Sequence, residues 1–545
     1  MQFVFQEHRF PDDLNYLIET CDATWNLTQD NLENVYNKIE NCIEQDLLSV
    51  YQAYEMLFHI AYYRQRQILA YDDLFSKILQ SHNLFSGENV FSSRYSPEIQ
   101  IAKHQYTDTN STLDIMKAIF EDNIEKFIEF SSVHGFNFRM VINNTFLVEL
   151  AAQYGSLNIF KFISNNISVD YQRTIMASII GGSYEIFHIC EKNCNIVPLL
   201  IEVSIVSYRN DIALYFQDHH NFEYSYPICT KSFNFVAFFY KIFIDNSDID
   251  SFDNNGYNPL ISSINDHLYV IFKYLVDSGA NVNVENVGLS TPLNFAAKNC
   301  PIKFVSYLVD KGADVNHMNS LGDTPLMLAS MIGNFDIVTF LVNHGAKVNE
   351  RNRNMQTCLM MACARNHLEI VKFLCDHGAD INMKDDQDTN CLLFAACNGN
   401  SDVCSYLIEK GVDIESKDVK NRTPLFLAVS YNCYKTAKLL LEKGANINTK
   451  NVDNISPINI IVCVKYPNLL ELLIKYGADI NSKDSEGKTP LINAIHLDCQ
   501  ESVKILLDHD ADINIEDNNG LNALIYANSL NDPIILEYIN KKVTK

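Results

Sequence analysis

The sequence predicts an all-α solenoid, a stack of similar helix pairs with hairpin fingers, preceded by a separate helical region. The main observation is a column of glycines with a constant step of 33, most of which begin the phrase Gly-Ala-(Asp/Asn)-(Val/Ile)-Asn, as Gly279 and Gly312 do. A second phrase, Thr-Pro-Leu, and a column of alanines return at the same step. A fixed period of this length is typical of a repeat protein, in which each unit buries its apolar face against its neighbours. The column reads Gly279, Gly312, Gly345, Gly378, Gly411, Gly444, Gly477 and Asp510.

Each part of the repeat has a physical role. A threonine such as Thr324 can cap the first helix, and the proline after it fits the first helical position, where no N–H is needed. The second helix carries Ile337, Val338 and Leu341 at helical spacing, so this face points inward. The glycine then ends the helix in a left-handed conformation. Asx side chains can hold the hairpin turn that follows by bonding nearby N–H groups. Their column is Asp253, Asn286, Asn319, Asn352, Asp385, Asp418, Asn451, Asp484 and Asp517.

The turn glycine, the Thr-Pro-Leu helix start and the Ile-Val-x-x-Leu second helix together resemble the ankyrin repeat. The family's usual His after Thr-Pro-Leu is absent, and Asn294, Met327 and Met360 begin that column. We therefore expect packing to replace most of a polar tie between repeats. The order of a helical leader, weaker helix pairs and a long regular array is similar to a lineage-expanded family of protist ankyrin proteins, whose leading region is uncharacterised. The resemblance implies no activity.

The chain is expected to have four regions. Residues 1–83 form a helical leader, with helices predicted from about Thr28 to Ile43, from about 46 to 69, and from 72 to 79. Residues 84–111, rich in Ser, Gly, Asn and Thr, are a connector. Residues 112–250 are degenerate ankyrin-like helical pairs with reduced fingers, and residues 251–545 are the regular repeats, ending in a truncated C-terminal cap.

Composition narrows the function. The chain has 545 residues, a net charge of −25 and 47% hydrophobic residues, with a pI near 4.9. Such an acidic chain disfavours general affinity for nucleic acids and for anionic membranes. Its start lacks the apolar core of a signal peptide, and no stretch is long enough to span a bilayer. The fifteen cysteines are scattered without paired spacing. We expect a reduced, cytoplasmic protein, with the nucleus as the alternative.

No motif predicts catalysis. The sequence has no Gly-rich phosphate loop, no Cys-x-x-Cys pair and no His-Glu-x-x-His. Cys190, Cys194 and His188 lie close in sequence but lack a second ligand cluster, so we expect core cysteines and no metal. His344, His377 and His509 precede turn glycines, where a cation suits the helix C-terminus. The chain is therefore expected to be no enzyme and to need no cofactor.

One column could bind a partner. The residue before the hairpin Asx is a cation in five consecutive repeats, and the resemblance places it on the concave side. The same resemblance places finger and inner-helix side chains there. A solvated face remains the plainer interpretation. The candidate residues are Arg351, Lys384, Lys417, Lys450 and Lys483 of the column, Arg353, Lys420 and Arg422 of the fingers, and Met331, Ile332, Arg365 and Tyr431 of the inner helices.

The sequence favours a non-enzymatic scaffold that binds another protein in its concave groove, with Arg and Tyr side chains as anchors. An acidic segment in the partner would fit the basic column. The alternative is an adaptor whose residues 1–83 dock an enzyme, such as a ubiquitin ligase, while the repeats select its substrate. An enzyme with its site in residues 113–250 and a nucleic-acid binder are weaker alternatives. The sequence leaves the oligomeric state open.

Overall fold

The computed structural model describes residues 10–63, 68–82, 112–133, 136–142, 145–246, 248–464, 466–530 and 532–543. It divides the chain into unit 1, Met1–Val287, and unit 2, Gly288–Lys545. The predicted borders at 83, 111 and 250 were drawn where the regularity of the sequence repeat changes, not where contacts divide the chain. These borders stay predictions. The predicted connector, residues 84–111, lies outside the described residues.

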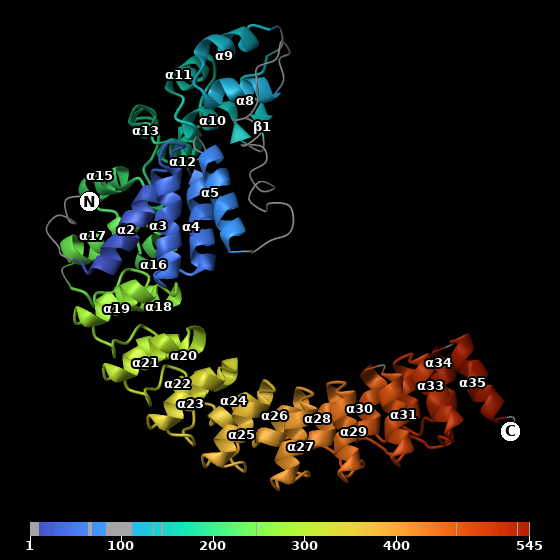
Figure 1. The fold of residues 1–545 in the computed structure, drawn as a ribbon. Helices are drawn as coiled ribbons and strands as arrows, with labels where there is room; N and C mark the ends of the chain where they lie inside the picture. The colour runs from blue at the N-terminus through green and yellow to red at the C-terminus, as the bar shows by residue number, and fades with distance from the viewer. Residues whose placement is uncertain are drawn as a thin grey trace. The chain divides into compact units, whose positions relative to one another are not determined.

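The leader of unit 1 contains four described helices, drawn in blue in Figure 1. Two of them, α3 and α5, match predicted helices, and α4 begins at Val50 within the predicted helix over 46–69, of which residues 64–67 lie outside the described part. The first, α2, was not predicted, although Leu14, Leu17, Ile18 and Cys21 carry helical spacing and are buried in the structure. The bounds are α2 Asp12–Trp25, α3 Leu32–Glu44, α4 Val50–Tyr63 and α5 Ile68–Ser81.

The rest of unit 1 is a series of helix pairs. We call the two members of a pair its first and second helix. The first helices α10, α12, α14, α16 and α18 pack on one another in order. A short antiparallel hairpin, in which Val141 faces Phe146, precedes α10. The elements are α8 Thr112–Phe120, α9 Ile124–Ser131, β1 Val141–Ile142, β2 Thr145–Phe146, α10 Leu147–Gln153, α11 Leu157–Asn166, α12 Tyr171–Gly181, α13 Tyr184–Glu191, α14 Leu199–Val206, α15 Asn210–His220, α16 Tyr226–Lys231, α17 Phe235–Tyr240, the π-helical η2 Lys241–Asn246, α18 Pro259–Asn265 and α19 Tyr269–Asp277.

Unit 2 consists of regular pairs whose first and second helices form two rows (Figure 1). The helices are α20 Pro292–Asn299, α21 Ile302–Asp310, α22 Pro325–Ile332, α23 Phe335–Asn343, α24 Cys358–Ala364, α25 Leu368–Asp376, α26 Cys391–Cys397, α27 Ser401–Glu409, α28 Pro424–Ser430, α29 Tyr434–Glu442, α30 Pro457–Val464, α31 Pro467–Lys475, α32 Pro490–His496, α33 Gln500–Asp508, α34 Ala523–Leu530 and α35 Pro533–Val543.

The predicted roles of the repeat residues are confirmed in unit 2. The Thr324 hydroxyl accepts a hydrogen bond from the Met327 N–H at 3.3 Å, which caps α22 as expected. The column glycines are left-handed, with φ of +89° at Gly345. The alanine column is fully buried between helices, and it includes Ala296, Ala329, Ala362, Ala395, Ala428, Ala494 and Ala527.

The fingers are held as the Asx column predicted. The Asn352 Oδ1 accepts hydrogen bonds from the N–H groups of Asn354 at 3.0 Å and Gln356 at 2.9 Å. Adjacent fingers are joined side by side, since the Arg353 N–H donates to the Leu321 carbonyl at 3.0 Å. The same two-bond Asx arrangement occurs at Asp253, Asn319, Asp385, Asp418, Asn451, Asp484 and Asp517.

The missing family histidine is only partly replaced by packing. At that column the Asn459 amide donates to the Ser482 carbonyl at 2.9 Å, a polar tie between neighbouring repeats. The Asn294 amide reaches the His317 and Asp323 carbonyls at 3.5 Å. An asparagine therefore supplies the polar tie at these positions, while the apolar Met327 and Met360 are buried.

Candidate protein-binding surface

The predicted basic column turns out to tie fingers together. The Lys450 Nζ donates to the Lys483 carbonyl at 2.6 Å, and the Lys483 Nζ donates to the Glu516 carbonyl at 2.9 Å. The Arg351 guanidinium makes the same contact with the Lys384 carbonyl, one repeat further on. Three of the five column cations thus donate hydrogen bonds to a neighbouring repeat. For these three, this supports a role in holding the fingers together.

A cluster of carboxylates interrupts the column at its second member. The finger that follows Lys384 carries Asp385, Asp386 and Asp388. The Lys384 Nζ lies 4.0 Å from the Asp388 Oδ1. Opposite charges this close and this exposed attract weakly, yet they cancel in the field felt by a distant ligand. A continuous positive stripe is therefore absent from this finger.

The cations available to a partner are fewer than the sequence indicated. Arg422 is half-buried, and its Nε and Nη2 both lie 2.6 Å from the Asp418 Oδ2. Arg353, Lys417 and Lys420 are exposed, and the contacts given for the described residues include no hydrogen bond or ion pair of their side chains. We call these three the finger cations.

Apolar side chains accompany the finger cations. Leu321, Met355, Val419 and Val452 are all exposed and stand in four separate finger turns. Val419 lies between Lys417 and Lys420 on a single finger. Exposed apolar groups occur on contact surfaces, where tryptophan, tyrosine and arginine side chains provide most of the binding energy and other apolar side chains exclude water around them.

The remaining predicted residues lie at the other end of the first helix. Ile332 is the last residue of α22, and Arg365 and Tyr431 follow directly after α24 and α28. All three are exposed, and Met331 is half-buried. A first helix of this length separates them from the fingers by about 10 Å at 1.5 Å per residue. The structure therefore does not bring these four residues together with the finger cations.

The position of Ile332 belongs to a feature that sequence reasoning missed. Four-residue turns at this end join each first helix to its second helix, and we call them the helix–turn edge of unit 2. Besides Ile332 and Tyr431, the edge exposes Phe335, Tyr434 and Leu497. The signal available in the sequence was a second apolar residue three positions after the first, as in Ile332 and Phe335 or in Tyr431 and Tyr434. The turns are residues 299–302, 332–335, 365–368, 398–401, 431–434, 464–467, 497–500 and 530–533, of which residues 465 and 531 lie outside the described part of the chain.

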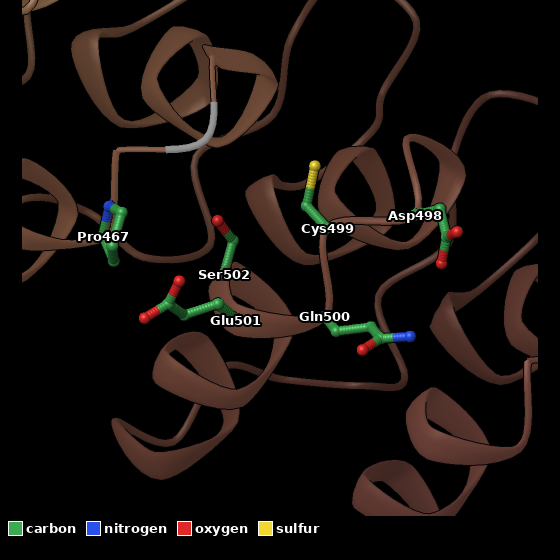
Figure 2. Close-up of a pocket in the computed structure, with 6 residues that line it drawn as sticks. All are labelled: Pro467, Asp498, Cys499, Gln500, Glu501 and Ser502. Atoms are coloured by element: carbon green, nitrogen blue, oxygen red, sulfur yellow. The ribbon is translucent and has the colours of Figure 1, made fainter.

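One hollow lies on this edge. It has a volume of about 200 Å³. In Figure 2, Glu501 and Ser502 extend toward Pro467, while Asp498 and Gln500 lie on the other side. The Gln500 amide donates to the Asp532 carboxylate at 2.7 Å, and this bond lowers the pKa of Asp532. The hollow is lined by Pro467, Asp498, Cys499, Gln500, Glu501 and Ser502.

The cysteines and histidines singled out in the sequence make local contacts in the structure. Burial raises the pKa of the Cys190 thiol to about 12, so the thiolate that would ligate a metal is disfavoured. His188 Nδ1 lies 2.9 Å from the Glu191 carboxylate. His344 caps α23, where its Nδ1 lies 2.8 Å from the Phe340 carbonyl, and His377 and His509 repeat this contact. Across the described residues no group of three His, Cys, Asp or Glu side chains could hold a metal ion.

Glu191 illustrates the polar contacts of unit 1. Its carboxylate accepts a 2.6 Å hydrogen bond from the Tyr215 hydroxyl, which raises the pKa of Tyr215 to about 12. Burial works against the ionised Glu191, but the bonds from Tyr215 and His188 outweigh it and lower its pKa. An ionised acceptor already bonded to two side chains is a structural link rather than an available base.

Comparisons with known families agree with this geometry. A family model described as ankyrin repeats (3 copies) matches residues 227–319, 293–385, 382–451 and 459–543. A model for a domain of unknown function, DUF3447, matches residues 164–241. No curated protein matches the chain significantly. Among the described residues, no helix is both long and apolar enough to cross a membrane. Ankyrin repeats indicate a protein–protein interaction module, and because the repeat matches cover more than half of the chain, it belongs to the ankyrin-repeat family.

Proposed function

We propose that this protein is a non-enzymatic scaffold that binds another protein through the concave groove of its repeats, at the finger surface around Val419. The observation that carries the proposal is the finger at Asp418. It exposes Val419 between Lys417 and Lys420, and its Asx turn is fixed by bonds to the Lys420 and Arg422 N–H groups at 2.9 and 2.8 Å. A rigid turn that presents one apolar and two cationic side chains loses little entropy on binding.

The chemistry of this finger favours an acidic segment in the partner. Lys417, Lys420 and Arg353 can pair with carboxylates, while Val419 and Met355 can take up apolar side chains between them. The local positive charge is small in a chain of net charge −25, so nearby pairing and apolar contact would provide most of the affinity. We do not propose nucleic-acid binding, because Asp385, Asp386 and Asp388 stand in the path of a phosphate backbone along the fingers.

The adaptor alternative gains no support from the leader. Its helices α2 and α4 already direct Trp25, Gln52 and His59 toward the helix pairs of unit 1. An enzyme-docking role would have to use the remaining leader surface, and no described contact favours that role over the scaffold.

Crosslinking mass spectrometry of the native complex tests the proposal. Lys417 and Lys420 have free exposed amines and should crosslink to an acidic segment of the partner. Lys450 and Lys483 serve as internal comparisons, because their ammonium groups are engaged by backbone carbonyls and should react less with the partner.

A matched pair of triple variants then measures affinity for the purified partner. Arg353, Lys417 and Lys420 changed to Ser should weaken binding, mainly through a slower association rate, and wild-type binding should weaken as salt rises. Arg351, Lys450 and Lys483 changed to Ser remove the same charge but should affect stability more than binding. Equal affinity of the first variant and the wild type at low salt would refute the proposed surface.

A further inference from the structure

The helix–turn edge of unit 2 concentrates exposed apolar side chains. Sixteen large apolar side chains are exposed in the described part of unit 2, and eight of them lie in these short turns. Seven of the eight recur at the first or the last residue of the turn, and Tyr466 is at the third. Each remains at least 38% exposed, although Phe335 also contacts Phe373 of α25 with ring centroids 5.7 Å apart. The eight are Ile302, Ile332, Phe335, Tyr431, Tyr434, Tyr466, Leu497 and Leu530.

Unit 1 shows what covers a corresponding turn. The turn between α14 and α15 contains Tyr208, whose ring stacks on Trp25 of α2 with centroids 4.8 Å apart and planes 18° apart. The Tyr208 hydroxyl donates to the Asp22 carboxylate of the same helix at 3.2 Å. In the helix-pair register Tyr208 corresponds to Asn432, the residue between Tyr431 and Cys433, because both follow the C-cap of a first helix with positive φ.

A second turn of unit 1 repeats this arrangement. The Gln52 amide of α4 donates to the carbonyls of Asp266 at 3.3 Å and His267 at 3.1 Å, in the turn between α18 and α19. Burial raises the pKa of Tyr269, at the start of α19, with Asp277 and the leader's Asp46 adding to the effect. Tyr269 holds the repeat position that Phe335 and Tyr434 hold in unit 2, where both rings are exposed.

The charge of the edge differs from that of the chain. The eight turns of unit 2 contain two cations, Arg365 and Lys465, and two carboxylates, Asp498 and Asp532, so their formal net charge is zero. The chain as a whole carries −25. A neutral surface rich in Tyr, Phe, Ile and Leu has the composition of the core of a protein–protein interface, from which charged residues are depleted.

We propose that the helix–turn edge of unit 2 is a second docking surface, which binds an amphipathic helix of a partner protein through its apolar face. The leader supplies the precedent, because helices α2 and α4 place an aromatic ring and an amide against the turns of unit 1. The occupant is a helix of low net charge with apolar residues at i, i+3, i+4 and i+7, spaced to meet successive turns. This surface is separate from the finger surface, so the protein would hold two partners at once.

The hollow beside Pro467 fits this occupant. At about 200 Å³ it is smaller than typical small-molecule sites, which measure about 300–1,000 Å³. It has room for a single side chain. Its lining joins the turn residue Pro467 of one repeat to Asp498, Cys499 and Gln500 of the next, so a helix lying along the edge would pass over it.

The test uses the full chain with the photoreactive residue p-benzoylphenylalanine at Tyr431, in cells that make the protein, and the same residue at Val419 as the finger control. The crosslinked peptide is identified by mass spectrometry. The protein that contains it is then purified and its affinity measured for two variants. The edge variant is Ile332→Ser, Tyr431→Ser and Leu497→Ser, whose side chains are 49%, 57% and 42% exposed. The finger variant is Leu321→Ser, Val419→Ser and Val452→Ser, at 64%, 49% and 56%.

The proposal predicts that Tyr431 crosslinks to an amphipathic helical segment of another protein. The edge variant should lower the affinity for that protein at least tenfold, while the finger variant stays within twofold and both variants unfold at the wild-type temperature. The proposal is overturned if Tyr431 gives no crosslink, if it crosslinks to residues 12–81 of a second copy, or if the edge variant binds normally. Crosslinks from Val419 alone would leave the proposed function standing, whereas no crosslink from either position would count against both.

Discussion

Units 1 and 2 use the same helix pair, but they use its two ends differently. In unit 2 the finger end carries the bonds between repeats, as in the Asn349 amide that donates to the Gly378 carbonyl at 2.9 Å, and the turn end is open. In unit 1 the turn end is covered by the leader through Trp25 and Gln52. The difference teaches that one repeat position can serve as an internal interface or as a surface, depending on what the chain places against it.

The largest expected effect is at the covered end. Trp25→Ala removes a side chain that is 2% exposed and stacked on Tyr208, and it should cost about 3–5 kcal/mol of unfolding free energy, as large core truncations do. Hydrogen exchange should show lost protection in unit 1 and unchanged protection in unit 2. Trp25→Phe, which keeps a ring, should cost less. Equal loss in both units would contradict the division drawn here.

A smaller loss is expected inside the regular array. Ala395 is fully buried in the alanine column, and Ala395→Leu should cost about 1–3 kcal/mol by overpacking. Because repeats couple to their neighbours, protection should fall first in the adjacent repeats of unit 2. Denaturant unfolding followed by hydrogen exchange measures both quantities, and an unchanged curve would refute the assigned packing. Ala395→Gly separates overpacking from a loss of helix propensity.

The finger bonds should contribute less each. Asn349→Ala removes the bond to the Gly378 carbonyl and the 2.9 Å bond from the Asp380 N–H. Since exposed hydrogen bonds contribute about 0.5–1.5 kcal/mol, the loss should be about 1 kcal/mol. Asn349→Asp keeps the oxygen that accepts the hydrogen bond from the Asp380 N–H, so this variant should lose less stability than Asn349→Ala. If Ala and Asp variants were equally stable, the Asp380 bond would contribute nothing, and the ladder would be weaker than drawn.

The smallest expected effect is a pH dependence of the stability of unit 1, caused by Asp266 in the turn that Gln52 of the leader contacts. Burial raises the pKa of Asp266, and Glu55 of α4 adds to this, against smaller opposing effects of Thr230, Lys231 and His267. A carboxyl with a raised folded-state pKa favours folding when it is protonated, and this stability is lost as pH rises above about 3.8, its ordinary value. Asp266→Asn should therefore stabilise unit 1 at neutral pH, with the gain shrinking toward acid pH.

Unfolding curves at several pH values check this prediction. Asp310→Asn, an exposed change in unit 2, is the control and should show no such trend. A constant difference between wild type and Asp266→Asn at every pH would mean that Asp266 does not titrate under the leader as described.

The regular fold could be predicted because a constant step repeats the same contacts. Thr324 and Asn352 each carry a local rule, a helix cap and an Asx turn, and such rules act within a few residues. The leader's α2 followed an ordinary helical pattern that was overlooked. Its seat on Tyr208 could not be predicted, because that contact joins residues 183 positions apart (208 minus 25) and no local pattern marks it.

The candidate site was predicted less well for a related reason. In the sequence, nothing shows that the ammonium groups of Lys450 and Lys483 have hydrogen-bond acceptors. Their acceptors are backbone carbonyls one repeat away, and every residue type has a backbone carbonyl. Arg353 and Lys420 follow the Asx residue of the finger, whereas Lys450 and Lys483 precede it. Tyr431 is exposed at the end of α28 away from the fingers, and its role as an anchor stays a prediction.

Hydroxyl-radical footprinting of the full chain, alone and with the partner identified by crosslinking, tests the central comparison most directly. In the free chain Tyr431 and Tyr434 should react readily, and Tyr208, beneath Trp25, should be protected. On binding, Tyr431 and Tyr434 should become protected while Tyr208 does not change. The account would be contradicted if Tyr208 reacted as readily as Tyr431 in the free chain, or if Tyr431 stayed fully reactive in the complex.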